Sequence, residues 1–180
     1  MSISINFCSF CGHPVETRIP EGDDRPRPVC PDCGRIHYTN PKIVVGSVPQ
    51  WDGKILLCRR AIEPRLGLWT LPAGFLEAGE TAEAGARRET REEAAAELSD
   101  VEPFALFNLA FVSQIYLMFR AQVMDGRSGA GKESLEAKLF EEKDIPWNEL
   151  AFTVVQETLA WYFEDRRRGR FTFHIGDISP

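Results

Sequence analysis

Residues 74–93 read GFLEAGETAEAGARRETREE, a stretch unusually rich in glutamate. At about 100° per residue in an α-helix, Glu89, Glu92 and Glu93 fall within an arc of roughly 100° on one helix face. Like charges at this spacing repel each other. Residues 77–97 carry seven glutamates and three arginines, a local charge of −4 that a cation should offset. Mg²⁺ or Mn²⁺ is the natural candidate, because hard cations prefer oxygen ligands.

A solvated amphipathic helix with ion pairs four residues apart is the alternative interpretation of a glutamate-rich helix. The fixed spacing of the stretch favours the metal site instead. It resembles the Nudix box, G-x5-E-x7-R-E-U-x-E-E-x-G-U with U apolar, through Gly74, Glu80, Arg88, Glu89, Glu92 and Glu93. Two positions depart from the pattern: Thr90 replaces an apolar residue and Ala95 replaces the final glycine. Neither departure removes a carboxylate, so they concern helix packing and the following turn rather than the chemistry.

The resemblance implies an α/β fold, the Nudix α/β/α sandwich with a mixed sheet, and hydrolysis of a nucleoside diphosphate linked to a moiety X. Glu89, Glu92 and Glu93 are then expected to bind the catalytic Mg²⁺ or Mn²⁺. The Gly74 carbonyl and Glu80 are further candidate ligands. A carboxylate must position or deprotonate the attacking water, and either Glu93 or an acid from a loop could do so.

Two more residues join Glu92 and Glu93 as candidate catalytic residues. Arg88 is expected to orient the glutamates by bidentate pairing rather than to touch substrate. Glu136 resembles a downstream acid that many Nudix enzymes bring to the metal centre. A surface charge at the start of a strand is the alternative interpretation of Glu136, and the sequence leaves both open.

The cysteines indicate a second unit. Cys8 and Cys11, then Cys30 and Cys33, have the C-x2-C spacing of a zinc ribbon, and a glycine after each pair permits a tight turn. Four thiolates complete the tetrahedral shell of Zn²⁺ and leave no position for water, so the expected site is structural. Two disulfides, the alternative, would need an oxidising compartment. Cys58 has no partner in the sequence and is expected in the core.

We expect the zinc ribbon over residues 1–38 and the Nudix hydrolase domain over residues 39–180. An exposed hairpin tip is expected near residues 20–28, and Trp51-Asp52-Gly53 should form a hairpin turn. The box helix should run from Thr81, as its cap, to about Leu98. The sequence predicts strands at residues 42–48, 55–57, 104–108, 114–123 and 138–142 and a last helix at 154–167.

Residues 126–132, GRSGAGK, match the phosphate-loop pattern G-x4-G-K. Glu133 stands where a Ser or Thr would hold Mg²⁺, and fewer than fifty residues follow, too few for a doubly wound sheet. We therefore interpret the stretch as a glycine-rich connection bordering the active site.

Composition narrows the class of protein. The 180 residues fit one main domain, and the 43% apolar content is ample for a core. The first six residues lack a basic region followed by an apolar one, and no long apolar span follows, so we expect a cytoplasmic protein that binds no membrane. A net charge of −6 makes nucleic acid an unlikely partner and leaves a small nucleotide substrate. The sequence leaves a homodimer open.

In having a zinc ribbon directly before a Nudix domain, the chain resembles two groups of enzymes. The NADH pyrophosphatases carry an S-Q-P-W-P-F-P-x-S array, whereas residues 113–118 here read SQIYLM. The chain is more similar to the FAD/ADP-ribose pyrophosphatase subgroup, which includes the plastid FAD pyrophosphatase of plants. This resemblance rests on residues 30–33, 40–42, 67–74, 133–136 and 171–174.

The resemblance makes FAD, cleaved to FMN and AMP, and ADP-ribose the leading substrates. Hydrolysis of NADH or of another nucleotide sugar is the alternative. A ligand sensor whose zinc ribbon binds nucleic acid or protein is an alternative of another class. A flat ring of the substrate should stack on an aromatic side chain, and Trp69, Phe75 and Tyr116 flank the expected metal site. Trp69 is equally suited to the core.

Overall fold

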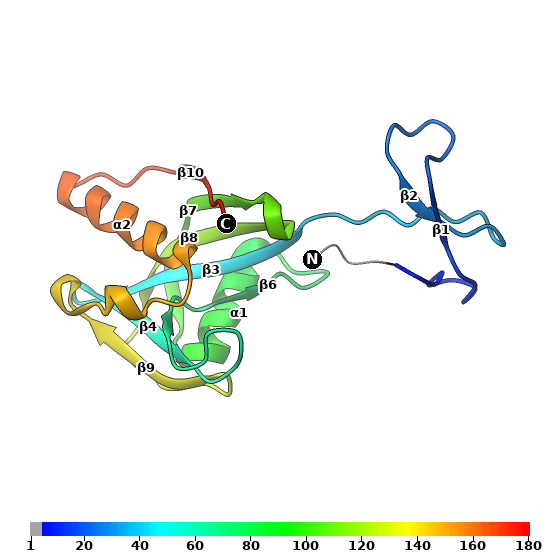
Figure 1. Cartoon of the computed structure of the whole chain (residues 1–180). Coiled ribbons are helices and arrows are strands. Elements are labelled where there is room, and N and C mark those ends of the chain that lie inside the picture. The colour runs from blue at the N-terminus through cyan, green and yellow to red at the C-terminus, as the bar shows by residue number, and fades with distance from the viewer. Residues whose placement is uncertain (1–4) are drawn as a thin grey trace. The chain divides into compact units, whose positions relative to one another are not determined.

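The computed structural model describes residues 5–180, so residues 1–4 of the N-terminal segment lie outside the described part. The chain divides into two compact units between Pro41 and Lys42. Figure 1 shows the elements. The strands are β1 (Glu16–Arg18), β2 (Arg27–Val29), β3 (Lys42–Trp51), β4 (Lys54–Arg60), β5 (Trp69–Thr70), β6 (Ala73–Phe75), β7 (Leu98–Leu109), β8 (Gln114–Val123), β9 (Ser134–Phe140) and β10 (His174–Asp177). The helices are α1 (Ala82–Ala94), α2 (Thr153–Arg168) and three 3₁₀ turns, Ala110–Val112, Glu142–Asp144 and Trp147–Glu149.

The N-terminal unit is a two-stranded antiparallel hairpin between two similar turns. In the first turn the Cys8 amide donates to the His13 carbonyl at 2.8 Å, and in the second the Cys30 amide donates to Arg35 at 2.9 Å. A glycine at positive φ closes each turn, Gly12 at 78° and Gly34 at 72°. Side chains with a Cβ rarely adopt this conformation, which explains the glycine after each cysteine pair.

The second unit is built on an eight-stranded mixed sheet with the order β10-β7-β8-β3-β4-β5. Strand β6 pairs with β3, and β9 pairs with β4. The pairs β3–β8 and β7–β10 are parallel, and the other pairs are antiparallel. A turn with positive φ at Asp52 and Gly53 joins β3 to β4, as the sequence predicted, because such turns match the twist of a hairpin.

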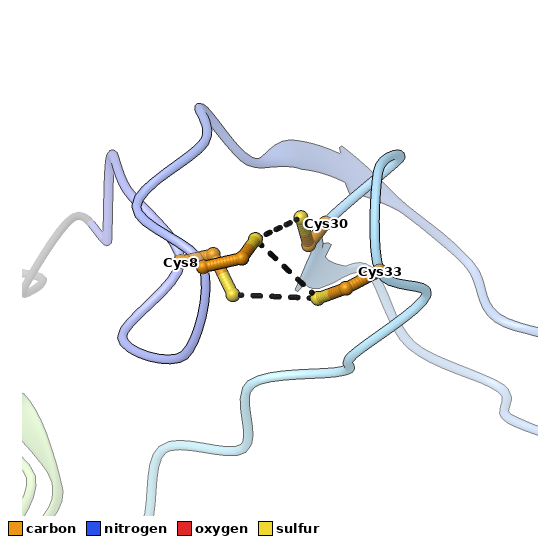
Figure 2. A group of neighbouring side chains, drawn as sticks. Cys8, Cys30 and Cys33 are labelled. Carbon is orange, nitrogen blue, oxygen red and sulfur yellow. Dashed lines mark hydrogen bonds between the residues drawn. The ribbon is translucent and has the colours of Figure 1, made fainter.

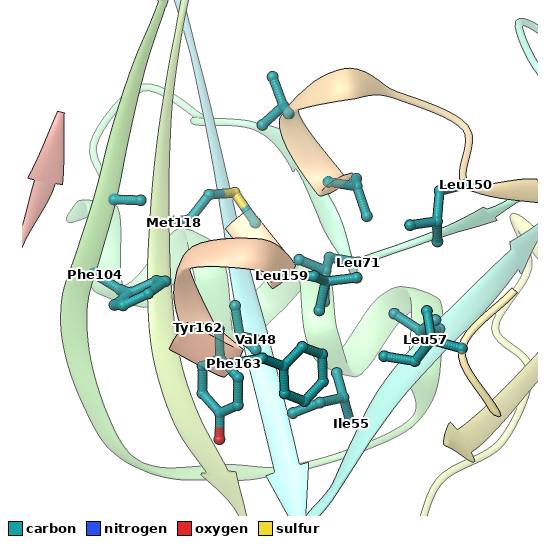
Figure 3. Packing of buried hydrophobic residues seen from close by; sticks show 14 of the residues in the cluster. Val48, Ile55, Leu57, Leu71, Phe104, Met118, Leu150, Leu159, Tyr162 and Phe163 are labelled. Carbon is teal, nitrogen blue, oxygen red and sulfur yellow. The ribbon is translucent and has the colours of Figure 1, made fainter. Parts of the chain in front are cut away.

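Helices cover the two faces of this sheet, which confirms the predicted α/β/α sandwich (Figure 1). Alternate side chains of β4 point to opposite faces of the sheet and so join different apolar clusters. Ile55 and Leu57 join the large cluster that α2 covers, drawn in Figure 3, whereas Leu56 and Cys58 join the cluster at the end of α1. Cys58 is 1% exposed, so it is the core residue that the sequence predicted.

Several elements differ from the expectation, and the strand expected at residues 104–108 is longer, running from Leu98 to Leu109. The box helix ends at Ala94 rather than near Leu98, because Ala95 adopts the left-handed conformation and its amide donates back to the Arg91 carbonyl at 3.0 Å. Residues 134–140 form the strand expected at 138–142, because they pair with β4. The terminal strand β10 was not predicted, since its pairing partner β7 lies far away in the sequence.

Candidate active site on the box helix

Helix α1 presents two acids of the box on its buried side. Thr81 caps the helix as predicted, with its hydroxyl accepting from the Ala84 amide at 3.1 Å. Glu89 and Glu93 are each 8% exposed. Glu92, one position before Glu93, has a side chain that is 59% exposed. The helix therefore turns two of the three proposed metal ligands inward and leaves the third near solvent.

Thr90 replaces the apolar residue of the family pattern without leaving a polar group unpaired. Its hydroxyl donates to the Ala86 carbonyl at 2.8 Å and lies 2.7 Å from the hydroxyl of Ser47 on β3. Since the Thr90 proton is used on Ala86, Ser47 donates to Thr90. A buried hydrogen bond between α1 and the sheet thus replaces an apolar contact, and the cost of burying an unsatisfied hydroxyl is avoided.

Gly74 is required by a close approach. It lies on β6, opposite Val45 of β3, and the Glu89 carboxylate packs directly against its α-carbon. A Cβ at this position would fall 2.3 Å from Glu89 Oε1 and 2.5 Å from Oε2, closer than any side chain tolerates. The glycine of the box therefore makes room for the glutamate carboxylate beside the backbone of β6.

Arg88 organises the acids of the box. Its guanidinium pairs with Glu80 through two hydrogen bonds, Nη2 to Oε1 at 2.7 Å and Nε to Oε2 at 3.1 Å. Nη1 donates to Glu89 at 2.6 Å and to Glu92 at 3.0 Å, and Nη2 also donates to the Phe75 carbonyl at 3.0 Å. The hydrogen bonds from Arg88 hold the pKa of Glu80 below its usual value. This is the bidentate, orienting geometry that the sequence suggested for Arg88.

Glu93 is poised near neutral pH. Burial raises its pKa to about 7, against the opposing effect of the Ala73 amide, which donates to Glu93 Oε2 at 3.1 Å. The negative charges of Glu89 and Glu133 add to the rise, and the positive charge of Arg60 counters it. Burial also raises the pKa of Glu89, even though Arg88 pairs with it.

The three proposed metal ligands do not converge on one point in this structure. Within residues 5–180, groups of three or more ligand atoms within 4.8 Å of one another occur only around the ribbon cysteines. Glu92 is turned to Arg88, and Glu89 lies beside Gly74. Arg88 thus supplies part of the positive charge that the glutamate-rich stretch requires.

The donor set nevertheless fits a hard divalent cation. The Glu89 and Glu93 carboxylates and the backbone of β6 offer only oxygen ligands. Both carboxyl groups are buried, and the negative charge of Glu89 adds to the raised pKa of Glu93, so a cation between them would relieve the repulsion.

The downstream acids behave differently from one another. Glu136 is exposed on β9, opposite Arg59 of β4. Glu133 is the acid whose charge acts on both Glu89 and Glu93, and its carbonyl accepts from the Ala61 amide at 2.8 Å. Sequence reasoning overlooked Glu133 as a site residue, because the motif E-S-L-E offers two acids and only the pairing of β9 distinguishes them.

The glycine-rich stretch wraps the end of the box helix. The Gly129 amide donates to the Ala94 carbonyl at 2.8 Å, and the Gly131 amide donates to the Glu93 carbonyl at 3.0 Å. A Cβ on Gly131 would fall 1.7 Å from the Glu92 carbonyl oxygen. Strand β9 follows this connection rather than the helix of a phosphate loop. The glycine-rich stretch therefore caps the C-terminal end of α1 and borders the candidate site.

The aromatic candidates separate by exposure. Trp69 is 7% exposed and packs edge-on against Phe140 at 4.9 Å, so it belongs to the core. Tyr116 is partly buried against the same core. Phe75 is 47% exposed, and Lys42 Nζ lies 5.0 Å from its ring centroid. Phe75 is the candidate of the three with a ring face open to a ligand.

The four ribbon cysteines converge as predicted (Figure 2). Sγ–Sγ distances are 3.7 Å for Cys8–Cys33, 3.4 Å for Cys11–Cys30 and 3.5 Å for Cys11–Cys33, and no disulfide forms. Tetrahedral Zn²⁺ with bonds of about 2.3 Å needs sulfur atoms roughly 3.8 Å apart, which these distances fit. A backbone hydrogen bond from Cys11 helps to lower the pKa of Cys8 to about 6. The neighbouring thiols and burial raise that of Cys11 to about 12, although the His13 amide opposes them, so a cation is needed to ionise the whole set.

Comparison with known families agrees with both units. A zinc-ribbon model described as Nudix N-terminal matches residues 6–39, and the NUDIX domain model matches residues 41–162. The chain belongs to the Nudix hydrolase family.

Individual relatives are of three kinds. A Nudix hydrolase from Nitrosomonas europaea is 50% identical and superposes with a TM-score of 0.94, over 98% of this chain and 100% of that one. An NAD-capped RNA hydrolase NudC from Photobacterium profundum is 32% identical over 86% of this chain and 58% of its own length. An ADP-ribose pyrophosphatase from Methanocaldococcus jannaschii is 30% identical over 69% of this chain and 76% of its own. The chain thus spans little more than half the length of the NudC relative.

Proposed function

We propose that this protein hydrolyses the pyrophosphate bond of an ADP-X compound in a reaction that depends on a divalent metal. The observation that carries the proposal is the pair of buried acids, Glu89 and Glu93, packed against the backbone of β6 beside a completely engaged Arg88. A structural helix gains nothing from two inward carboxyls with raised pKa, whereas a hydrolase needs both a metal site and a base.

Glu89, Glu92 and Glu93 would hold Mg²⁺ or Mn²⁺, with the Gly74 carbonyl and Glu80 as further candidate ligands. When bound, the metal would neutralise charge that develops on the phosphate oxygens. Arg88 keeps the carboxylates in place through Glu80, Glu89 and Glu92. Glu92 is the least constrained ligand, because its single pairing with Arg88 is near solvent.

Glu93 is our candidate general base. A base works best when its pKa lies near the working pH, and the pKa of about 7 meets that condition. Glu133 is the loop acid that competes with it for this role, since its charge acts on both buried glutamates. Glu136 is a weaker candidate, because it stands opposite Arg59 on β9 and, unlike Glu133, does not contribute to the raised pKa of Glu89 or Glu93.

ADP-ribose and FAD are the substrates we favour. The similarity to an ADP-ribose pyrophosphatase supports the first. The exposed ring of Phe75 supports either, because stacking of a base on an aromatic side chain contributes roughly 1–3 kcal/mol. Phe75→Ala should raise KM for FAD more than for ADP-ribose if the isoalloxazine ring stacks there.

NADH or an NAD cap on RNA is the second candidate substrate. It is favoured by the NudC relatives, whose similarity extends over 86% of this chain in the first of them. The sequence SQIYLM at residues 113–118, in place of the NADH pyrophosphatase array, weighs against it.

The deciding experiment is an assay of FAD, ADP-ribose, NADH and NAD-capped RNA with Mg²⁺ and then with Mn²⁺. Release of AMP from ADP-ribose, with FMN from FAD, is the expected result. Preferential cleavage of NADH or capped RNA would replace our substrates with the second candidate. Cleavage of none of these compounds would contradict the enzymatic proposal.

We also propose that the protein acts in the cytoplasm. All five cysteines are unbonded, and the zinc ribbon needs four reduced thiolates, which a reducing compartment preserves. Within residues 5–180, neither helix is long and apolar enough to cross a membrane.

A further inference from the structure

Arg60, at the end of β4, occupies a position that the reaction outlined above does not use. The ladder between β4 and β9 shifts register at this point, with Arg59 opposite Glu136 and Arg60 opposite Ser134. Hydrogen bonds to Leu68 and from Gly67, each of 2.9 Å, hold the Arg60 backbone. The backbone of Arg60 is therefore held in a fixed position at the end of β4.

The Arg60 side chain is fixed as well. Nε donates to the Pro64 carbonyl at 2.9 Å, and the guanidinium carbon lies 5.1 Å from the centroid of the Phe152 ring. These contacts use one N–H and one face of the guanidinium. The N–H groups of the terminal nitrogens Nη1 and Nη2 therefore remain available to donate to a ligand.

The neighbours of Arg60 belong to the candidate site. Two residues earlier on β4, the Cys58 thiol lies 3.6 Å from the Glu93 carbonyl, and the next residue, Ala61, donates its amide to Glu133. Burial raises the pKa of both Glu93 and Tyr116, and the positive charge of Arg60 opposes that rise at each of them. The guanidinium therefore lies within electrostatic range of the buried base.

Arg60 differs from Arg88 in one decisive respect. Arg88 pairs with three carboxylates, whereas within residues 5–180 no carboxylate oxygen lies within 4.0 Å of the Arg60 nitrogens. A half-buried guanidinium without an anionic partner next to an acidic site is suited to an anion that arrives with the substrate.

We propose that Arg60 binds the pyrophosphate of the substrate through Nη1 and Nη2. The inference rests on the proposed function for the identity of the anion. The substrate brings negative charge to a site that already holds three acids, Glu89, Glu93 and Glu133. A fixed guanidinium on the sheet side offsets that repulsion and selects diphosphate compounds over neutral nucleosides.

The test measures binding of α,β-methylene-ADP, which cannot be hydrolysed at the bridging position, and of adenosine, in the presence of Mg²⁺. The intact protein is compared with Arg60→Gln, Arg60→Lys and the matched control Arg59→Gln. Arg59 is the adjacent arginine. Its Nε also donates to a loop carbonyl, that of Gly67 at 2.9 Å, and among the described residues no carboxylate forms an ion pair with it.

Arg60→Gln should weaken the affinity for α,β-methylene-ADP by about tenfold to a hundredfold, as expected for a hydrogen-bonded charge. The affinity of Arg60→Lys should lie between those of the intact protein and Arg60→Gln, because lysine keeps the charge but loses the paired N–H donors of the guanidinium. Arg59→Gln should change the affinity by less than about twofold, and adenosine binding should be unaffected in every variant.

An unchanged affinity in Arg60→Gln, with or without a lower melting temperature, would make Arg60 a structural residue and overturn the proposal. Failure of the intact protein to bind α,β-methylene-ADP would overturn it too. If binding depends on Arg60 but no ADP-X compound is cleaved, the proposed hydrolysis fails and the anion site stands.

Discussion

At the residue scale, two neighbouring glutamates on α1 lie in opposite environments. Glu92 is near solvent and paired with Arg88, whereas Glu93 is buried with one backbone donor. The folded state therefore opposes ionisation of Glu93, since its pKa is raised above the value of 4.5 for a free glutamate. As the pH rises above about 4.5, ionisation of Glu93 therefore destabilises the folded state. This indicates that Glu93 serves chemistry rather than stability.

Glu93→Gln should lower turnover by about 10² to 10⁴, the usual range for a catalytic acid or base. The melting temperature at pH 8 should be equal or higher, because the amide keeps an acceptor for the Ala73 amide and removes the buried charge. The control is Glu83→Gln, which breaks only an exposed pair with Arg87 and should leave turnover unchanged. Near-normal turnover of Glu93→Gln at saturating Mg²⁺ would exclude Glu93 as the base.

At the element scale, the end of α1 depends on the single residue Ala95. Its φ of 47° and ψ of 35° are left-handed, a conformation in which the Cβ is strained and for which the family pattern has glycine. Ending the helix there lets the chain enter β7 at Leu98 and exposes the last carbonyls of α1 to the amides of Gly129 and Gly131.

Ala95→Gly should stabilise the protein by roughly 1 kcal/mol, because it relieves the left-handed strain of an alanine. Ala94→Gly, one residue earlier and still helical, should destabilise it by a similar amount through lost helix propensity. Urea denaturation of the three proteins measures both effects. A loss of stability in Ala95→Gly would show that the strain is absent.

The terminal strand β10 is attached through Asp165 of α2. The Asp165 side chain is 2% exposed, and its Oδ2 accepts from the Thr172 amide at 2.9 Å and from His174 Nε2 at 2.8 Å. His174 stacks on Trp161 at 4.8 Å between ring centroids. Burial alone would raise the pKa of Asp165, but the donors from Thr172 and His174 outweigh it and lower the pKa.

A lowered pKa means that ionised Asp165 stabilises the fold above about pH 4, the ordinary aspartate range, and loses this effect as pH falls through the lower folded value. Asp165→Asn should therefore reduce stability at pH 7 by about 1–3 kcal/mol, and the difference from the unaltered protein should shrink below pH 4. The control is Asp177→Asn on the exposed side of β10. A difference independent of pH would contradict the assignment.

At the scale of the whole molecule, the two units draw their stability from different sources. The sheet unit has a large apolar core, whereas the described part of the N-terminal unit buries only Val29, Pro20 and two ribbon cysteines, Cys8 and Cys30, as apolar residues. A unit of this size needs a metal to fold, and the four converging sulfur atoms provide its site.

Cys30→Ser should release zinc and unfold the N-terminal unit before the box is affected. The metal content should fall from one zinc per chain, and proteolysis should remove the ribbon while the Nudix domain persists. Cys58→Ala, which alters a core thiol outside the ribbon, should retain the metal. Full zinc content and an unchanged melting curve in Cys30→Ser would count against the ribbon.

The sequence by itself determined the features that depend on local physical chemistry. The cysteine spacing predicted the ribbon, Thr81 predicted the start of α1, and the β-branched run at residues 42–48 predicted β3. In each case the interacting groups lie within a few residues of one another, or the spacing itself specifies the ligand geometry.

Only the tertiary structure decided the features made by segments far apart in the chain. These are the contact of Gly74 with Glu89, the effect of Glu133 on Glu93, the strand β10, and the position of the Arg60 guanidinium beside the candidate site. Burial and electrostatic environment depend on which strands lie side by side, and no local pattern carries that information. The acids of the box were therefore predictable as a set, but their individual roles follow from the packing around them.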